Sequence, residues 1–414
     1  MGYLTHEVNA NSNGKPNKFV YREITAQDAF GNIEGTKLNG DSLTGEYLYH
    51  GTSGQMLSSK VQFGAQVLHH LGYTDYDSYG NLRTQENYAP DFTHTSTDTF
   101  KYDALHRLIY SDYSVGGSLP KEIHYGYDAV GNITKKSDYS LNTANAYTYT
   151  TGTNQIASVD LKGGGTTTFG YDNKGNQTHR NGTQEVTYNV FNKPLTIQKN
   201  GSNITLAYGA DLARYKQTRV ENGKTGSPQT ITTHYIDKHY EVEIDETGNK
   251  ERKSYISDIA IFTDSDTTGI DISYTHRDRL GSAATFTDHD NIVKARRHFD
   301  PFGKPRNGDW NVLEDLGLSA QLNTNLLDTN MDTRRGFTDH EHLDEAELIH
   351  MNGRVYDYNV GRFMSVDPFI QAPTNTQSVN PYSYIMNNPM SGIDPTGYCP
   401  CLLYTSDAAD EVVS

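Results

Sequence analysis

One short pattern recurs along the chain: a strand-like run ends on Tyr-Asp, and Gly-Asn and an apolar residue usually follow. An Asp at this position can accept hydrogen bonds from backbone N–H groups further on, and Gly supplies the positive φ that a tight turn needs. Each copy therefore predicts a β-hairpin turn. The residues expected to hold these turns are Tyr76, Asp77, Tyr102, Asp103, Tyr127, Asp128, Gly131, Tyr171, Asp172 and Gly175.

The spacing of the copies predicts one large sheet. The anchor positions recur every 17 to 26 residues, about the length of one hairpin and its connections, at Tyr76, Tyr102, Tyr127, Tyr149, Tyr171, Tyr188 and Tyr208. A single hairpin is marginal in water, whereas hairpins laid side by side bury one another's faces. A long antiparallel sheet must then curl or close to protect its edges. We therefore predict an all-β fold in which hairpins form a curled, spiral antiparallel sheet.

Composition and charge exclude several classes of protein. The formal net charge is −16, which argues against binding a nucleic-acid backbone. No apolar run is long enough for a membrane-spanning helix, and the polar segment Met1–Lys18 does not resemble a signal peptide. We find no phosphate-binding loop, cysteine-rich zinc pattern or nucleophile elbow, so no cofactor is expected.

The last third of the chain carries several short motifs in a fixed order. They are Tyr274-Thr-His-Arg-Asp-Arg-Leu-Gly-Ser282, Phe299-Asp-Pro-Phe-Gly303, Gly336-Phe-Thr-Asp-His-Glu-His342, Gly353-Arg-Val-Tyr-Asp357, Gly361-Arg-Phe-Met-Ser-Val-Asp-Pro368, Asn380-Pro-Tyr-Ser-Tyr384, Asn387-Asn-Pro389 and Asp394-Pro-Thr-Gly397. Together with the Tyr-Asp repeats, this order resembles Rhs proteins with their repeat-associated core domain, the C components of Tc toxins, and teneurins. The core-motif positions that carry the resemblance are Gly361, Arg362, Phe363, Pro368, Asn387, Asn388, Pro389, Asp394, Pro395 and Gly397.

The resemblance implies a hollow shell. In this family the repeats wind into a cocoon, the core domain closes one end as a plug, and a variable toxin follows the final Asp-Pro-x-Gly. We accordingly expect a poorly ordered lead-in over 1–20, a β-shell over 21–270, the core domain over 271–398 and a tail over 399–414. We also expect the shell to be incomplete at its N-terminus, because family shells have more repeats.

The tail and the expected function follow from the same resemblance. The string from Cys401 to Ser414 resembles a translated sequencing adapter, so we expect the toxin domain to be missing. The expected function is encapsulation and delivery of a C-terminal toxin by a secreted or cell-surface bacterial protein that acts in competition between bacteria. Its partners would be its own toxin cargo and a secretion or delivery apparatus. An extracellular adhesion or carbohydrate-binding surface remains the alternative.

One catalytic role is implied by the resemblance. Some family members act as an intramolecular aspartyl protease, in which two carboxylates share a proton and cut just after the last Asp-Pro-x-Gly-Leu. The matching positions here are Arg354 and Asp367, with Asp357 as the nearest second acid, and the cut would follow Tyr398. The family leucine is replaced by Tyr398, and the segment 369–378 replaces a second short motif. A buried ion-pair network that pins the plug is the alternative interpretation.

A metal site is the weaker hypothesis for a histidine-rich stretch. His340 and His342 are two residues apart, which places both on one face of a strand. No third ligand follows at a recognised spacing, so no metal is expected.

Overall fold

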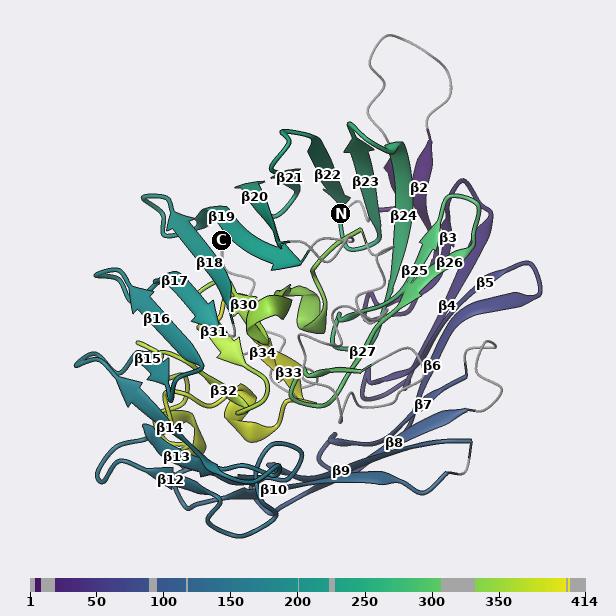
Figure 1. The fold of residues 1–414 in the computed structure, drawn as a ribbon. Helices are drawn as coiled ribbons and strands as arrows, with labels where there is room; N and C mark the ends of the chain where they lie inside the picture. The colour runs from purple at the N-terminus through teal and green to yellow at the C-terminus, as the bar shows by residue number, and fades with distance from the viewer. Residues whose placement is uncertain are drawn as a thin grey trace.

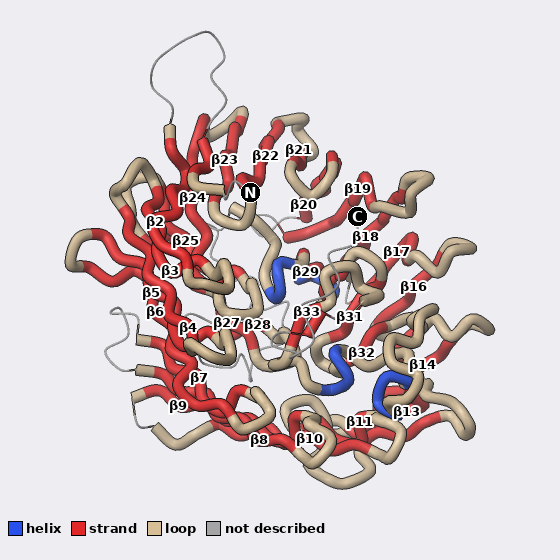
Figure 2. The backbone as a smooth tube through the Cα atoms, turned by 180° about the vertical axis from the view of Figure 1, so that it is seen from behind, coloured by secondary structure: helices blue, strands red, loops and turns tan. Residues whose placement is uncertain are grey.

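The computed structural model describes residues 4–8, 19–88, 95–116, 118–199, 201–222, 228–306, 332–399 and 401–402. Their regular structure is β-strand, apart from four short 3-10 helices. The first strands form two antiparallel meanders in chain order, an 11-stranded sheet from β1 to β11 and a 15-stranded sheet from β12 to β26. Figure 1 shows these strands as a curved wall around the later part of the chain, and Figure 2 shows the same ring from behind.

The strands of the first sheet are β1 (His6–Val8), β2 (Val20–Gln27), β3 (Ile33–Leu38), β4 (Leu43–Tyr49), β5 (Met56–Phe63), β6 (Gln66–Tyr76), β7 (Leu82–Asn87), β8 (Ser96–Tyr102), β9 (Leu108–Val115), β10 (Lys121–Tyr127) and β11 (Ile133–Lys136). Those of the second are β12 (Tyr147–Tyr149), β13 (Ile156–Asp160), β14 (Thr166–Tyr171), β15 (Gln177–Arg180), β16 (Gln184–Tyr188), β17 (Pro194–Lys199), β18 (Ser202–Tyr208), β19 (Arg214–Asn222), β20 (Pro228–Ile236), β21 (Tyr240–Ile244), β22 (Lys250–Ile256), β23 (Ala260–Ser265), β24 (Gly269–Arg277), β25 (Ala283–Asp288) and β26 (Val293–Arg296).

The turn after each Tyr-Asp pair has one repeated geometry. In the copy at Asp77, one carboxylate oxygen accepts from the N–H groups of Tyr79 and Asn81, both at 2.9 Å, and the other accepts from the Asn81 side chain at 2.9 Å. Asp128 and Asp172 make the same set of bonds with the residues two and four positions on. Each of these turns follows an even-numbered strand of an antiparallel meander, so they lie along one rim of the wall.

The anchor tyrosines link each hairpin to the preceding one. The Tyr102 hydroxyl donates to the Leu82 carbonyl at 2.7 Å, and the Tyr127 hydroxyl donates to the Leu108 carbonyl at 2.6 Å. Tyr76, Tyr149 and Tyr188 donate in the same way to Met56, Ile133 and Gln177. Tyr171 differs, because its hydroxyl accepts from the Ile156 N–H at 3.2 Å. Successive hairpins are thus joined by side chains as well as by the backbone ladder.

Two ends of the wall overlap at a seam. Residues of β2–β6 and of the last strands share one apolar cluster, which contains Tyr21, Leu38, Leu43, Val61, Leu68, Ile259, Ala260 and Tyr274. The Asn39 side-chain amide also donates to the His289 carbonyl and to Asn291, each at 2.8 Å. Because the strand order of each sheet is open-ended, the wall curls over itself rather than closing through backbone hydrogen bonds.

Three buried histidines lie at this seam. His69 on β6 bonds Ser59 at 2.9 Å and Thr285 on β25 at 3.1 Å, and its ring centroid is 5.9 Å from that of His276 on β24. His298 begins the short strand β27 (His298–Phe299), which pairs with β28 (Pro305–Arg306). Burial, together with the charge of Arg296, lowers the pKa of His276 and of His298 to about 3. Burial also lowers the pKa of His69 well below its usual range. The three histidine rings at this overlap are therefore neutral near pH 7.

The plug lies on the concave side of the wall. Its strands are β29 (Glu341–Leu343), β30 (Leu348–Met351), β31 (Arg354–Asp357), β32 (Arg362–Phe363), β33 (Gly392–Ile393) and β34 (Cys401–Leu402). Its 3-10 helices are η1 (Phe337–Asp339), η2 (Asp344–Ala346), η3 (Thr376–Val379) and η4 (Ile385–Asn387).

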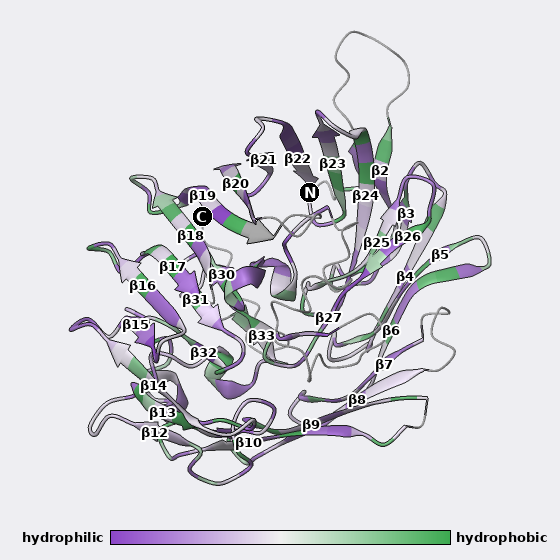
Figure 3. Ribbon diagram, in the orientation of Figure 1, coloured by the Kyte–Doolittle hydropathy of each residue, from purple (hydrophilic) through white to green (hydrophobic). Residues whose placement is uncertain are grey.

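Figure 3 shows polar and apolar residues interleaved along the wall strands, as expected because successive side chains of a strand point to opposite faces. The inward residues of β6–β14 form one core with the plug.

The predicted fold, an all-β curled antiparallel sheet around a plug, is confirmed. The division of the chain at residues 20, 270 and 398 stays a prediction, and the hairpin ladder itself continues through Arg296. Much of the expected lead-in and residues 403–414 of the expected tail lie outside the described residues. No helix in the described part of the chain is long and apolar enough to cross a membrane.

Replacing Tyr127 by Phe tests the link between hairpins. The substitution keeps the ring but removes the donor to the Leu108 carbonyl, so we expect the free energy of unfolding to fall by about 1–2 kcal/mol. Denaturant titration followed by circular dichroism measures this loss. Tyr79→Phe is the matched control, because Tyr79 is 77% exposed and should change stability by less than about 0.5 kcal/mol. Equal losses in both variants would contradict the assigned role.

The histidines predict that acid weakens the seam. The pKa of His276 is about 3 in the folded chain and near 6.5 when exposed, so the unfolded chain binds the extra proton. Stability should therefore fall as the pH drops below about 6.5, by about 1.4 kcal/mol per pH unit for each such histidine, until the folded form also titrates. Thermal melts between pH 7.5 and 5 measure the slope. His276→Gln should flatten it, whereas the exposed His239→Gln should not; an unchanged slope in the first variant would refute the assignment.

Candidate functional site

Asparagines of the core motifs bind the rim turns of the wall. The Asn388 side chain donates to Asn81 at 2.8 Å, and the Asn380 side chain donates to Asn132 at 3.0 Å. The Asn387 side chain donates to the Gly131 carbonyl at 2.9 Å. The repeated turns therefore present hydrogen-bond acceptors along the rim, and asparagine side chains of the plug donate to them.

Two rim glycines allow the plug to approach closely. Gly131 and Gly175 have φ of +78° and +83°, which L-residues rarely adopt. A Cβ on Gly131 would lie 2.7 Å from Gln377 Oε1, and one on Gly175 would lie 2.7 Å from Val366 Cγ2. The Tyr382 hydroxyl also donates to the Gly175 carbonyl at 2.8 Å. These glycines are thus needed both for the turn and for the contact.

The Gly361-Arg-Phe motif orders the centre of the plug. Gly361 has φ of +77°, and its N–H donates to the Asp357 carbonyl at 2.8 Å. Arg362 donates to Asn380 at 3.1 Å, and its guanidinium lies 5.2 Å from the centroid of the Tyr149 ring on the wall. Phe363 supports the guanidinium of Arg354, which lies 3.6 Å from its ring centroid.

Arg354 is the centre of the candidate site. It lies on β31, is 3% exposed, and makes ion pairs through Nη2 with Asp367 at 2.9 Å and Asp394 at 3.4 Å. Its Nη1 donates to the Pro381 carbonyl at 3.1 Å, and its Nε donates to the Gly397 carbonyl. One guanidinium therefore holds two carboxylates against the Asp-Pro-Thr-Gly turn.

The peptide bond after Tyr398 lies beside this cluster. The N–H of Cys399 donates to Asp394 Oδ1 at 2.9 Å, and the Tyr398 carbonyl accepts from the Gln371 side chain at 2.5 Å. Tyr398 is half-buried and Cys399 is exposed, so water can reach the bond. The Tyr398 hydroxyl donates to the Gly353 carbonyl at 2.9 Å, which fixes the residue before the bond.

A lysine of the wall reaches the same place. Lys193, in the turn before β17, donates to the Gly353 carbonyl at 3.0 Å, and its Nζ lies 4.9 Å from the centroid of the Tyr398 ring. Burial and the nearby Arg354 lower the pKa of Lys193. The site is therefore completed by the wall.

Asp357 lies in a different ion pair. It occupies the same strand as Arg354 but three positions on, so the two side chains point to opposite faces. Asp357 pairs with Arg180 of β15, and its Oδ1 accepts from the N–H groups of Asn359 and Val360. The structure therefore brings Arg354, Asp367 and Asp394 together, while it places Asp357 in the ion pair with Arg180.

The electrostatics of the acids differ. Burial raises the pKa of Asp367 despite the ion pair with Arg354, and the proximity of Asp394 raises it further. The pKa of Asp357 is lowered, because the opposing effect of burial is outweighed by the positive charges of Arg180 and Lys199. Asp357 is thus a structural anion, whereas the environment of Asp367 favours uptake of a proton.

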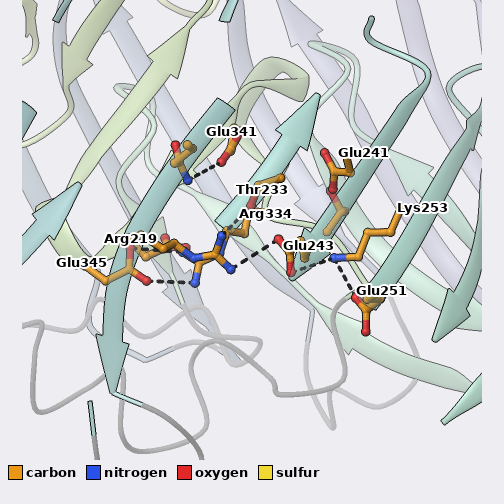
Figure 4. A network of polar contacts seen from close by, with 12 residues as sticks. Arg219, Thr233, Glu241, Glu243, Glu251, Lys253, Arg334, Glu341 and Glu345 are labelled. Atoms are coloured by element: carbon orange, nitrogen blue, oxygen red, sulfur yellow. Dashed lines mark hydrogen bonds and ion pairs between the residues drawn. The ribbon is translucent and has the colours of Figure 1, made fainter. Parts of the chain in front are cut away.

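Further buried ion pairs tie the plug to the wall. Lys136 of β11 is fully buried and lies 2.6 Å from Asp138 and 3.5 Å from Asp300. Figure 4 shows a second network between the inner face of β19–β22 and the start of the plug. In it Arg219 bonds Thr233 at 2.9 Å and Glu243 at 3.3 Å, and Glu341 of the plug accepts from Gln217 at 3.1 Å. This side of the interface is therefore polar.

The histidine-rich stretch is occupied by local bonds. His340 bonds Thr338 at 2.9 Å, His342 accepts from the Phe337 N–H at 3.1 Å, and His350 faces the Tyr208 hydroxyl at 3.4 Å. Within the described ranges, no three His, Cys, Asp or Glu side chains gather as a metal site would require. These histidines belong to the packing of the plug.

Sequence reasoning did not place three residues at this site: Gln371, Lys193 and Asp394. Asp394 was noted only as part of the final Asp-Pro-x-Gly motif. Lys193 stands where other copies of the turn carry Asn, as at Asn81 and Asn132, and that departure was the available signal. No signal marked Gln371, because only the fold brings it to Tyr398.

Comparison with known proteins gives distant similarities. No family model matches the chain. It is 25% identical over 289 residues to the tRNA3(Ser)-specific nuclease WapA of Bacillus spizizenii and 25% identical over 281 residues to the tRNA nuclease WapA of Bacillus subtilis. Each match covers 66% of this chain and 11% of the relative, so the chain spans about a tenth of the length of these relatives.

Solved structures share the fold. The crystal structure of TcdB2-TccC3-Cdc42 matches with a TM-score of 0.70 and 17% identity, over 96% of this chain and 20% of that one. The Photorhabdus luminescens Tc holotoxin pore, with a mutated TccC3, matches with a TM-score of 0.71 and 17% identity, over 94% of this chain and 20% of that one. The curled wall with its plug is therefore an architecture found in Tc toxin components.

Proposed function

We propose that this chain is a shell segment of an Rhs-type bacterial toxin, and that the shell encloses and delivers a toxin domain that follows the plug. The observation that carries the proposal is the wall itself, whose strands curl around the plug and overlap at a seam. The similarity to toxin components and to WapA nucleases supports it. The protein would be secreted or displayed at the bacterial surface.

The position of the Asp-Pro-Thr-Gly turn fits such a role. The turn is held by Arg354 and by Asn352, whose side-chain amide donates to the Pro395 carbonyl at 2.8 Å. A Cβ on Gly397 would lie 2.0 Å from the Met351 carbonyl oxygen, so the turn is seated tightly on the β30–β31 hairpin. A cargo joined after this turn would therefore start from a fixed point on the plug.

Expression of the downstream reading frame tests this proposal. We expect the gene to continue past Tyr398 into a separate domain, followed by a small gene for an immunity protein. The downstream domain alone should arrest bacterial growth, whereas the same domain joined to its complete shell should be tolerated; colony counts measure both. A downstream domain that is harmless alone, together with binding of the shell to a carbohydrate array, would favour adhesion instead.

We also propose that the chain cuts itself after Tyr398. The contact that favours this is the bond from the Cys399 N–H to Asp394, because Asp394 shares Arg354 with Asp367. Two carboxylates so placed can divide the work, one as base for a water and the other as acid for the leaving nitrogen. The ionised member of the pair would take the proton of the water, and the protonated member would supply a proton to the nitrogen of Cys399.

Carboxamide variants test the self-cleavage. We expect the wild-type chain to yield a product that ends at Tyr398, seen by intact mass spectrometry. Asp367→Asn and Asp394→Asn should each slow its formation by at least about a hundredfold, since general acid–base catalysis contributes about that much or more. Asp357→Asn, if folded by circular dichroism, should still be cut. A folded wild type that stays intact would end this proposal.

A further inference from the structure

Gln371 is held against the peptide bond that follows Tyr398. Its side-chain Nε2 donates to the Tyr398 carbonyl oxygen at 2.5 Å. Two residues earlier, the Phe369 ring packs edge-on against the Tyr398 ring, with 6.2 Å between the centroids. The loop that carries both residues thus contacts the side chain and the carbonyl of Tyr398 together.

The loop itself is braced from within. The Ser378 hydroxyl donates to the carbonyls of Ala372 and Asn375 and accepts from the Ala372 N–H at 3.3 Å. The Asn375 N–H donates to the Ala372 carbonyl at 2.9 Å. These bonds fix Ala372, the residue after Gln371. The loop that carries Gln371 therefore holds the amide in position toward the Tyr398 carbonyl.

We propose that Gln371 is a catalytic residue of the self-cleavage, in which its amide stabilises the negative charge that develops on the Tyr398 carbonyl oxygen. The inference rests on the proposed self-cleavage and assigns the polarising group of that reaction. Preorganised donors at such an oxygen are among the largest contributions to acyl-transfer catalysis. The Arg354 guanidinium cannot serve here, since it is engaged by two carboxylates and two other carbonyls.

The reaction balances with water as the only co-reactant. The water oxygen bonds to the carbonyl carbon of Tyr398 while one of its protons passes to the ionised member of the Asp367–Asp394 pair, and the carbonyl π electrons move to the oxygen beside Gln371. When the C–N bond breaks, the electron pair stays on the nitrogen of Cys399, which takes the proton held by the other member of the pair. The carbonyl re-forms, leaving a carboxyl group on Tyr398 and an amine on Cys399.

The test follows cleavage of the whole chain during cell-free synthesis, with denaturing quench and intact mass detection. Gln371→Ala should slow formation of the product that ends at Tyr398 by at least about tenfold; a fully enclosed donor is worth about a hundredfold or more, and Gln371 is exposed. Gln371→Glu has the same shape but adds a negative charge beside the developing oxyanion. It should be slower still at neutral pH, and its rate relative to that of the wild type at the same pH should rise as the pH falls and the new carboxyl group is protonated.

Gln198→Ala is the matched control. Gln198 is also an exposed glutamine, but it lies on the wall strand β17 and belongs to no part of the site. We expect its cleavage rate to stay within about threefold of the wild type. Circular dichroism melts establish that all variants fold.

The outcomes separate this inference from the proposal beneath it. A Gln371→Ala rate equal to the wild type, or equal losses in the Gln371 and Gln198 variants, would overturn the role of Gln371 and leave self-cleavage standing. A folded wild-type chain that is never cut would overturn the self-cleavage and the inference with it. A loss confined to the Gln371 variants, with the pH response of Gln371→Glu, supports the assignment.

Discussion

The hydrogen bond from an anchor tyrosine to a carbonyl of the preceding hairpin is the contact on which the wall depends. Strand ladders alone can slip in register or flatten, because the backbone bonds are alike at every step. A hydroxyl that meets one particular carbonyl, as Tyr102 meets Leu82, fixes where each hairpin lies against the last. Five anchor tyrosines make this contact, and between the hairpins so joined the right-handed twist of the strands curls the sheet.

The aligned turns then determine how the plug binds. The Asp of each turn consumes the local N–H groups, so the outward-facing groups that remain are carbonyls and the Asn side chains. Asn81, Asn132 and Gly131 offer these acceptors to Asn388, Asn380 and Asn387. The asparagines of the core motifs therefore supply side-chain amide donors to the acceptors on the rim, which is built from Asp-x-x-Gly-Asn turns.

The sequence was sufficient for the fold because the repeat is local. Turn residues, anchor spacing and strand period all lie within about 25 residues, and they predict the hairpins without knowledge of distant contacts. The seam was not predictable in the same way, since His69, His276 and His298 meet only after the wall has curled. The residues of the candidate site also fall into a group that the sequence indicates and a group that only the fold brings together. Arg354 and Asp367 follow from motif position, and Asp394 also stands in a motif of the sequence. Only the fold shows that Asp394 and Gln371 lie beside the peptide bond after Tyr398, and that Asp357 pairs with Arg180 on the other face of its strand.

Buried charges at the contact of plug and wall fix its position. Lys136 with Asp138 and Asp300, and Arg180 with Asp357, are removed from water on both sides. Leaving one member of such a pair alone costs about 3–5 kcal/mol, so a plug displaced by one residue would meet that penalty at several places at once. The same displacement would withdraw Gly353 and Tyr398 from Lys193 of the wall. The two carboxylates, the peptide bond after Tyr398 and the wall lysine consequently come together only in a seated plug, so the self-cleavage that we propose would require the wall to be in place.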